Sequence, residues 1–193
     1  MKIRESGMPP LEKWEQFFDT EHVLDALQLP SDCQRVVEFG CGYGTFTLAA
    51  AARIDGTVCG VEIDPVMVAT VRERASAFGL DNVELVRRDF VARGTGQADS
   101  SADYVMLFNI LHHDKPGLML AEAWRVLRGG GYLAIVHWNH DETTPRGPPM
   151  AIRPRPDQCL EWAVDAGFES QAAEIDLPPY HFGLILEKPG GES

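Results

Sequence analysis

The sequence predicts an α/β fold built on a mostly parallel sheet. Short runs rich in β-branched residues alternate with longer segments of helical period, which is typical of a parallel sheet covered by helices. One run, 102–108, is apolar almost throughout and suits a strand buried on both faces. The last two runs are joined only through residues 178–181, so we expect a hairpin and an antiparallel last strand.

Strand and helix signals follow one another along the chain. Pro65 suits the first turn of a helix. The glycines 129–131 and Gly167 each end a helix, because glycine readily adopts the left-handed conformation. The predicted strands are 35–39, 57–63, 83–86, 102–108, 132–137, 172–177 and 182–187. The predicted helices are 46–53, 65–78, 116–127 and 156–166.

The length of 193 residues fits a single domain over 1–193, with a core that needs no disulfide or metal. Residues 1–30 are expected to form an N-terminal helical cap, since four large apolar residues in 11–18 have helical spacing. This cap has three open roles: covering a ligand, packing on the sheet edge, or forming a dimer contact. Residues 139–156 form the longest irregular connection, which we expect on the substrate side.

The net charge of −12 disfavours a protein that binds nucleic-acid phosphates or anionic lipid. Four scattered cysteines indicate reduced thiols. The sequence has no secretory h-region and no apolar stretch of about 20 residues. We therefore expect a cytoplasmic protein without membrane contact, whose oligomeric state the sequence leaves open.

The strongest motif is a glycine loop that directly follows the first strand and precedes the first helix of the sheet. It reads Glu38-Phe39-Gly40-Cys41-Gly42-Tyr43-Gly44. A dinucleotide fingerprint would place its third glycine at position 45, which is Thr45 here. Glycines let the backbone approach a ligand closely, and an acid before them suits a cationic amine better than a pyrophosphate.

Two further acidic positions follow the second and third strands. Glu62 lies 22 residues after Gly40, where a carboxylate can accept both hydroxyls of a ribose, with Asp64 as the fallback. Asp89 and Phe90 follow the third strand, where they could meet an adenine. Each has a plain structural alternative: a solvated acid, a helix cap and a core residue.

These motifs resemble those of class I S-adenosylmethionine-dependent methyltransferases, of the small methyltransferase-domain or UbiE-like group. The resemblance covers roughly residues 30–190 and includes the turns 60–65 and 88–90 and the segment 125–132. It implies a Rossmann-like three-layer sandwich with seven strands, the last one reversed, and S-adenosyl-L-methionine as cofactor. The cofactor-binding residues it implies are Glu38, Gly40, Cys41, Gly42, Gly44, Glu62, Ile63, Asp89, Phe90 and Asn109.

Five of the six histidines fall near the carboxyl ends of predicted strands, where open α/β sheets bind ligands. They are His112, His113, His137, His140 and His181. A histidine there could act as a general base. We favour His112, with His137 as the second candidate catalytic residue. The same cluster could hold a divalent ion, but the spacings match no usual metal pair, so no metal is expected.

The sequence thus predicts transfer of a methyl group to a small-molecule acceptor by in-line displacement, with no nucleic-acid partner. A protein or RNA methyltransferase is one rival, disfavoured because the run from Asn109 reads Asn-Ile-Leu-His instead of Asn-Pro-Pro-Tyr. A non-catalytic cofactor-binding regulator is the other. Arginines at 146, 153 and 155 could pair with an acceptor anion or simply keep the loop solvated.

Overall fold

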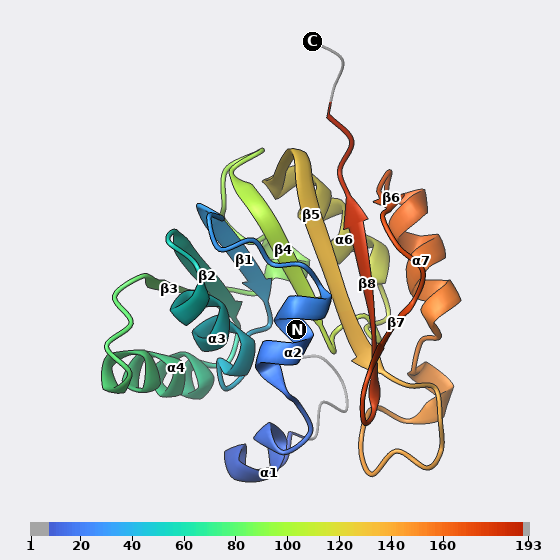
Figure 1. Cartoon of the computed structure of the whole chain (residues 1–193), viewed down its shortest axis with the longest axis horizontal. Helices are drawn as coiled ribbons and strands as arrows, with labels where there is room; N and C mark the ends of the chain where they lie inside the picture. The colour runs from blue at the N-terminus through green and yellow to red at the C-terminus, as the bar shows by residue number, and fades with distance from the viewer. Residues whose placement is uncertain (1–7, 191–193) are drawn as a thin grey trace.

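In the computed structural model, which describes residues 8–190, one sheet of eight strands runs through the molecule (Figure 1). The strand order is β3-β2-β1-β4-β5-β8-β6, with β7 paired to β8. The strands are β1 (Arg35–Phe39), β2 (Thr57–Glu62), β3 (Val83–Arg87), β4 (Ala102–Phe108), β5 (Leu127–Trp138), β6 (Glu169–Ser170), β7 (Ile175–Leu177) and β8 (His181–Glu187). The five strands β3, β2, β1, β4 and β5 run parallel to one another. β8 is antiparallel to β5, β6 and β7.

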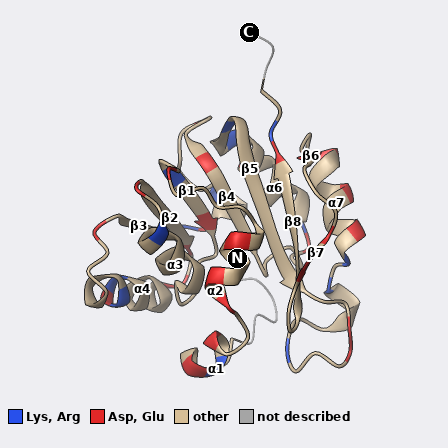
Figure 2. Cartoon of the chain, in the orientation of Figure 1, with Lys and Arg blue, Asp and Glu red and all other residues tan. Residues whose placement is uncertain are grey.

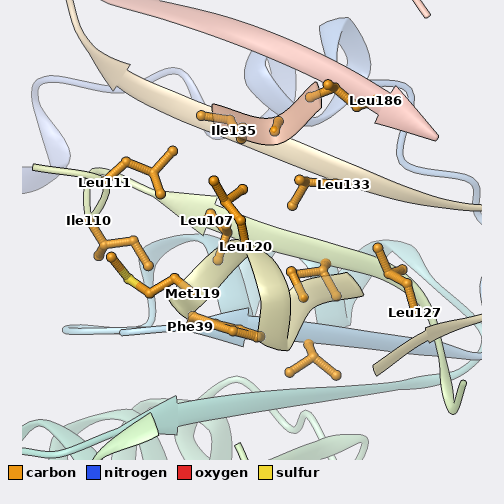
Figure 3. Packing of buried hydrophobic residues seen from close by; sticks show 14 of the residues in the cluster. Phe39, Leu107, Ile110, Leu111, Met119, Leu120, Leu127, Leu133, Ile135 and Leu186 are labelled. Carbon is orange, nitrogen blue, oxygen red and sulfur yellow. The ribbon is translucent and has the colours of Figure 1, made fainter. Parts of the chain in front are cut away.

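Helices cover both faces of the sheet. They are α1 (Leu11–Glu15), α2 (Thr20–Ala26), α3 (Thr45–Arg53), α4 (Pro65–Ala77), α5 (Phe90–Arg93), α6 (Pro116–Val126) and α7 (Pro156–Asp165), with a short 3-10 turn at Met150–Ile152. One core layer packs the sheet against α2 and α3, and the other packs it against α6 and α7. Figure 3 shows the second layer, where Leu120 of α6 lies beside Leu107 of β4 and the side chain of Met119 extends towards Ile110. The predicted Rossmann-like three-layer sandwich is confirmed.

The C-terminal part of the sheet differs in detail from the prediction. The two-residue strand β6 was not anticipated, and β7 is shorter than the predicted 172–177. β5 starts at Leu127, five residues early, because Leu127 already pairs with Ala102 before the ladder shifts and resumes at Tyr132. Gly130, with φ +75°, absorbs that shift.

Residues 1–7 of the predicted N-terminal cap 1–30 lie outside the described residues, and the rest of this segment contains two short helices. α1 ends at Glu15, and Asp19 starts α2 by accepting a hydrogen bond from the backbone N–H of His22. Phe17 and Phe18, which share the predicted helical spacing with Leu11 and Trp14, lie in the turn between them. Both rings contact the sheet: Phe17 packs on Trp138 of β5 with ring centroids 5.3 Å apart, and Phe18 packs on His181 of β8 at 4.5 Å.

The carboxyl ends of the parallel strands meet at one edge of the sheet. α1 and the connection after β5 lie at the same edge, at the bottom of Figure 1. Acidic residues are spread over the outer helices α1, α2 and α7 (Figure 2). Among residues 8–190, no helix is long and apolar enough to cross a membrane.

Candidate functional site

A cavity of about 920 Å³ opens at the carboxyl edge of the sheet. It is lined by the glycine loop and the ends of β1, β2 and β4, together with residues from the segments 142–153 and Met8 to Trp14. Nine of the ten residues predicted to bind the cofactor line it: Glu38, Gly40, Cys41, Gly42, Glu62, Ile63, Asp89, Phe90 and Asn109. The fold therefore brings three separate strand-end motifs to one place.

Gly44 is the exception, because it does not line the cavity. It starts α3 with φ +76°, and a Cβ there would lie 2.8 Å from Cγ1 of Val71 on α4. Its role in the structure is to let α3 and α4 approach each other. Gly40, by contrast, lines the cavity with φ +73°. A Cβ at this position would lie 3.2 Å from Cγ2 of Ile110 and 4.0 Å from the ring of Phe90.

Glu38 lies at the bottom of the cavity and is 3% exposed. Its carboxyl group accepts a hydrogen bond from the hydroxyl of Thr47. Burial, opposed by that hydrogen bond and reinforced by the nearby Glu62, raises the pKa of Glu38 to about 8. A cationic group entering the cavity would stabilise the ionised form.

Glu62 connects the second strand to the glycine loop. Its Oε1 accepts hydrogen bonds from the backbone N–H groups of Ile63 (2.8 Å) and Asp64 (2.9 Å), and its Oε2 accepts one from Gly42 (3.0 Å). A carboxylate offers about four acceptor positions, so part of its capacity is left for a ligand hydroxyl. Asp64, the fallback, uses Oδ1 to cap α4 through the N–H of Val66.

Asp89 and Phe90 are a helix cap and a core residue, as the structural alternatives predicted, and they also line the cavity. Asp89 caps α5 by accepting from the N–H of Ala92, and Phe90 packs on Phe39 with ring centroids 5.3 Å apart. A helix cap and a core contact thus do not exclude contact with a ligand.

Among residues 8–190, four of the five buried side-chain polar atoms without a hydrogen-bond partner belong to residues that line the cavity. They are Oγ1 of Thr45, both polar side-chain atoms of Asn109, and Nε2 of His112; the fifth, Nε2 of His181, belongs to a residue that does not line it. Asn109 also has φ +56°, an uncommon conformation for a residue with a side chain. Buried polar groups are normally satisfied, so three such residues around one cavity point to a ligand that completes them.

The two predicted catalytic histidines form a buried pair. Nδ1 of His112 lies 3.2 Å from Nε2 of His137. His112 lines the cavity, whereas His137 lies inside β5, is 0% exposed and does not line it. Burial lowers the pKa of His112 to about 4, with His113 and Arg153 adding to the effect, and burial also lowers the pKa of His137.

The remaining histidines point to other partners. His113 accepts from the N–H of Lys115, and Nδ1 of His140 lies 2.8 Å from the carbonyl oxygen of Arg153. His181 packs between the rings of Phe18 and Trp138, at 4.5 and 4.3 Å. Within residues 8–190, no three histidine, cysteine or acidic side chains form a metal-binding group.

An aromatic wall that the sequence analysis missed closes the cavity near the N-terminal cap. We use this name for Trp14, Phe46, Phe108 and Trp138, which all line the cavity. Phe18 lies behind them, with ring centroids 4.9 Å from Trp14, 5.2 Å from Phe46 and 6.5 Å from Trp138. The sequence signal for this wall was the set of aromatic residues at helical spacing in 11–18. The signal for Thr45, which also lines the cavity, was its position where a dinucleotide fingerprint has glycine.

Arg153 organises the connection after β5. Its guanidinium is buried and donates to the backbone carbonyls of residues 139, 141, 146 and 148 and to the hydroxyl of Thr144. Arg153 is therefore not a solvated loop residue, one of the two alternatives considered for it; it lines the cavity, and its pairing with an acceptor anion stays a prediction. The connection is a folded wall of the cavity, held by one side chain.

Comparison with known proteins places the chain in a family. The sequence profile described as a methyltransferase domain matches residues 36–131. Phosphatidylethanolamine N-methyltransferase of Cereibacter sphaeroides is 30% identical over 148 residues, which cover 74% of this chain and 70% of that protein. The chain belongs to the S-adenosylmethionine-dependent methyltransferases.

Solved structures agree with the fold. A SAM-dependent methyltransferase from Aquifex aeolicus has a TM-score of 0.80 at 24% identity, with 92% of this chain and 93% of that chain covered. The cyclase SpnF has a TM-score of 0.75 at 19% identity, with 93% and 82% covered. At such identities the likeness concerns the fold alone.

Two other relatives correct the expected partners. The 23S rRNA (uracil(1939)-C(5))-methyltransferase RlmD of Stenotrophomonas maltophilia is 43% identical over 68 residues, 35% of this chain but only 15% of that protein. Ribosomal protein L11 methyltransferase of Caldanaerobacter subterraneus is 34% identical over 64 residues, 33% and 21%. The expectation of a small-molecule acceptor without nucleic acid is therefore wrong as an exclusive statement. Net charge and length reflect the whole surface and do not report what one cavity accepts.

Proposed function

We propose that this chain transfers the methyl group of S-adenosyl-L-methionine, by in-line displacement, to an acceptor atom held in the cavity at the carboxyl edge of the sheet. The observation that carries this proposal is the lining of that cavity. The carboxylates of Glu38, Glu62 and Asp89 line it together with the unsatisfied polar side chains of Thr45, Asn109 and His112. Family membership supplies the reaction class.

The residues present fit the cofactor. Glu38 and the glycines 40 and 42 would hold its cationic amino-acid part, where a buried acid favours a positive charge. Glu62 would accept from ribose hydroxyls, and Asp89 and Phe90 would contact the adenine. Ile63, Cys41 and Asn109 complete the predicted contacts.

When bound, the cofactor supplies an electrophilic methyl group on a positively charged sulfur. The chain contributes alignment and exclusion of water, and positioning of this kind supplies on the order of 7–11 kcal/mol. Arg153 holds the connection 139–153 against the cavity, and the aromatic wall keeps the acceptor side dry. His112 would take the proton of an acceptor that must lose one.

The acceptor enters as a small molecule or as the projecting end of a larger one. The relative with the longest of the matches given above is named for N-methyl transfer to phosphatidylethanolamine, and the shorter matches are named for rRNA and a ribosomal protein. All three acceptor classes therefore belong in the activity test.

Thermal unfolding with S-adenosylhomocysteine tests cofactor binding, with NAD as the control ligand. A ligand that binds only the folded state stabilises it by about 2.7 kcal/mol at a hundredfold excess over Kd. We expect S-adenosylhomocysteine to raise the melting temperature and NAD to leave it unchanged. The reverse result would refute the proposal.

Transfer of labelled methyl groups then separates an enzyme from a regulator. The panel contains metabolites, phosphatidylethanolamine in detergent, total RNA and ribosomal proteins. Transfer to one class identifies the acceptor. Cofactor binding without transfer to any class would favour the non-catalytic regulator.

A further inference from the structure

We infer that His137 fixes the tautomer of His112, so that the site is built for an acceptor atom that must lose a proton: a hydroxyl, a thiol or an N–H group. This inference deepens the proposed function and rests on it. It assigns His137 a positioning role, because its side chain does not reach the cavity.

The chain of hydrogen bonds starts at a backbone carbonyl. Nδ1 of His137 lies 3.5 Å from the carbonyl oxygen of Trp138, which can only accept. We assign the proton of a neutral His137 to Nδ1, where it can donate to this carbonyl oxygen, and its Nε2 then has a free lone pair. Which nitrogen of a histidine ring carries the proton is set by the hydrogen bond that the other nitrogen makes.

That lone pair determines the state of His112. Nε2 of His137 lies 3.2 Å from Nδ1 of His112, and two ring nitrogens at this distance need one proton between them. Since His137 offers only a lone pair, His112 donates from Nδ1. Its Nε2 then carries the lone pair.

The lone pair on Nε2 of His112 has no partner in the part of the chain that the structure describes. His112 is 8% exposed and lines the cavity, and its Nε2 is fully buried. A buried acceptor atom on the wall of a cavity suits a ligand that brings a donor. An acceptor atom without a proton would leave Nε2 unsatisfied.

The charged and titratable groups around the pair keep both rings neutral. Burial lowers the pKa of both rings. The charges of His113 and Arg153 also lower the pKa of His112, and those of His181 and Arg153 lower the pKa of His137, so each ring is disfavoured as an imidazolium before the reaction. A neutral imidazole at neutral pH has its lone pair available before the reaction.

The transfer balances in protons and electrons. The acceptor atom forms one bond to the methyl carbon and gives its proton to Nε2 of His112, while the electron pair of the broken carbon–sulfur bond stays on the sulfur. One positive charge thus leaves the sulfur, and one appears on the imidazole of His112. His112 keeps its Nδ1 bond to His137 throughout and returns to the neutral form when the proton passes to water.

Nitrogen NMR of the histidine rings tests the tautomers and needs no acceptor. On protein with labelled histidines at pH 7, we expect His112 and His137 both to be neutral, with the proton on Nδ1. Either ring protonated on Nε2, or either as imidazolium, would overturn the inference. Because cofactor binding is measured separately by the melting shift with S-adenosylhomocysteine, a wrong tautomer with an intact shift rejects the relay and spares the proposed function.

Substitutions supply the second readout. His137→Phe removes the partner of Nδ1 and should shift part of His112 to the Nε2-protonated form, whereas His137→Gln offers an amide oxygen there and should restore the Nδ1 form. The melting shift should be unchanged in both. The exposed His22→Gln is the matched control. An unchanged His112 spectrum in folded His137→Phe would also reject the inference.

Turnover is compared between two groups of acceptors. Secondary amines, alcohols and thiols have a proton to lose, and tertiary amines and thioethers have none. We expect methyl transfer only to the first group. His112→Ala should lower kcat by about 10²–10⁴. Equal turnover of tertiary amines would overturn the assignment of the acceptor class.

Discussion

The two sides of the cavity satisfy their polar groups in different ways. On the side of β1 and β2, Glu62 accepts three backbone N–H groups and Glu38 accepts from Thr47. On the side of β4 and β5, Asn109 and His112 have buried polar atoms that no described residue satisfies. The carboxylates of the first side thus already have hydrogen bonds within the chain and keep capacity for a ligand, whereas Asn109 and His112 on the second side depend on a ligand to complete theirs.

The largest expected effect on ligand binding concerns Glu62, because it accepts a hydrogen bond from the glycine loop and is proposed to accept from the cofactor as well. Glu62→Gln keeps one acceptor oxygen and should abolish most of the thermal stabilisation by S-adenosylhomocysteine, about 2.7 kcal/mol at a hundredfold excess over the wild-type Kd. Asp64→Ala is the control, since Asp64 caps α4 and should cost only about 1 kcal/mol of stability without reducing the shift. The opposite result would move the ribose contact to Asp64.

Arg153 carries the next effect, on the side of the cavity that the loop forms. Arg153→Met removes a buried donor set from several carbonyl groups and should lower the free energy of unfolding by about 3 kcal/mol. The exposed neighbour Arg155→Met should cost less than 0.5 kcal/mol, as surface substitutions usually do. Urea unfolding measures both, and equal losses would contradict a wall held by Arg153.

A smaller effect separates space from backbone conformation at the glycine loop. Gly44 and Gly79 have similar positive φ values, +76° and +68°, but a Cβ at Gly44 meets Val71 at 2.8 Å and one at Gly79 meets nothing within 4 Å. Both alanine variants are strained at the backbone by about 1–2 kcal/mol. Gly44→Ala should cost about 2 kcal/mol more, through overpacking. Similar unfolding midpoints for the two variants would show that α3 and α4 move apart freely.

The same contrast explains what the sequence revealed. The cofactor side consists of contiguous motifs after consecutive strands, so Glu38, Glu62 and Asp89 could be assigned a common place from their order alone. The other side combines Trp14, His112 and Arg153 from distant segments, and one sequence contains no information on their distances. His112 was found through its position after a strand, but the positioning role that we propose for His137 required the fold.

Element boundaries divide along similar lines. β1, β4 and α6 follow local patterns of apolar residues, and their predicted limits agree with the structure to within one residue, although the glycines 129–131 lie inside β5 and do not end α6 as predicted. β5 begins early because Leu127 pairs with Ala102, a contact that depends on the neighbouring strand. Tertiary pairing of this kind leaves no local signal.

The smallest effect is a pH dependence in which the two sides oppose each other. His112 and His181 have pKa values lowered by burial to about 4 and about 3, and that of His137 is lowered too, so their contribution to stability is present above pH 6.5 and is lost as the pH falls towards 4. Glu38, with its pKa raised by burial from 4.5 to about 8, acts in the other direction, and stability falls as the pH rises through that range.

Between pH 4.5 and 6.5 three histidines outweigh one carboxyl group, and between 6.5 and 8 Glu38 acts against stability alone, so the free energy of unfolding should peak near pH 6.5. The decline from there to pH 8 should be about 1 kcal/mol. Glu38→Gln cannot ionise and should lose this decline while keeping the acid limb. Urea unfolding at pH 5.5, 6.5 and 8 measures both limbs. An equal decline above pH 6.5 in both proteins would mean that Glu38 is already ionised in the folded state, and the cofactor side would then carry its negative charge before any cation arrives.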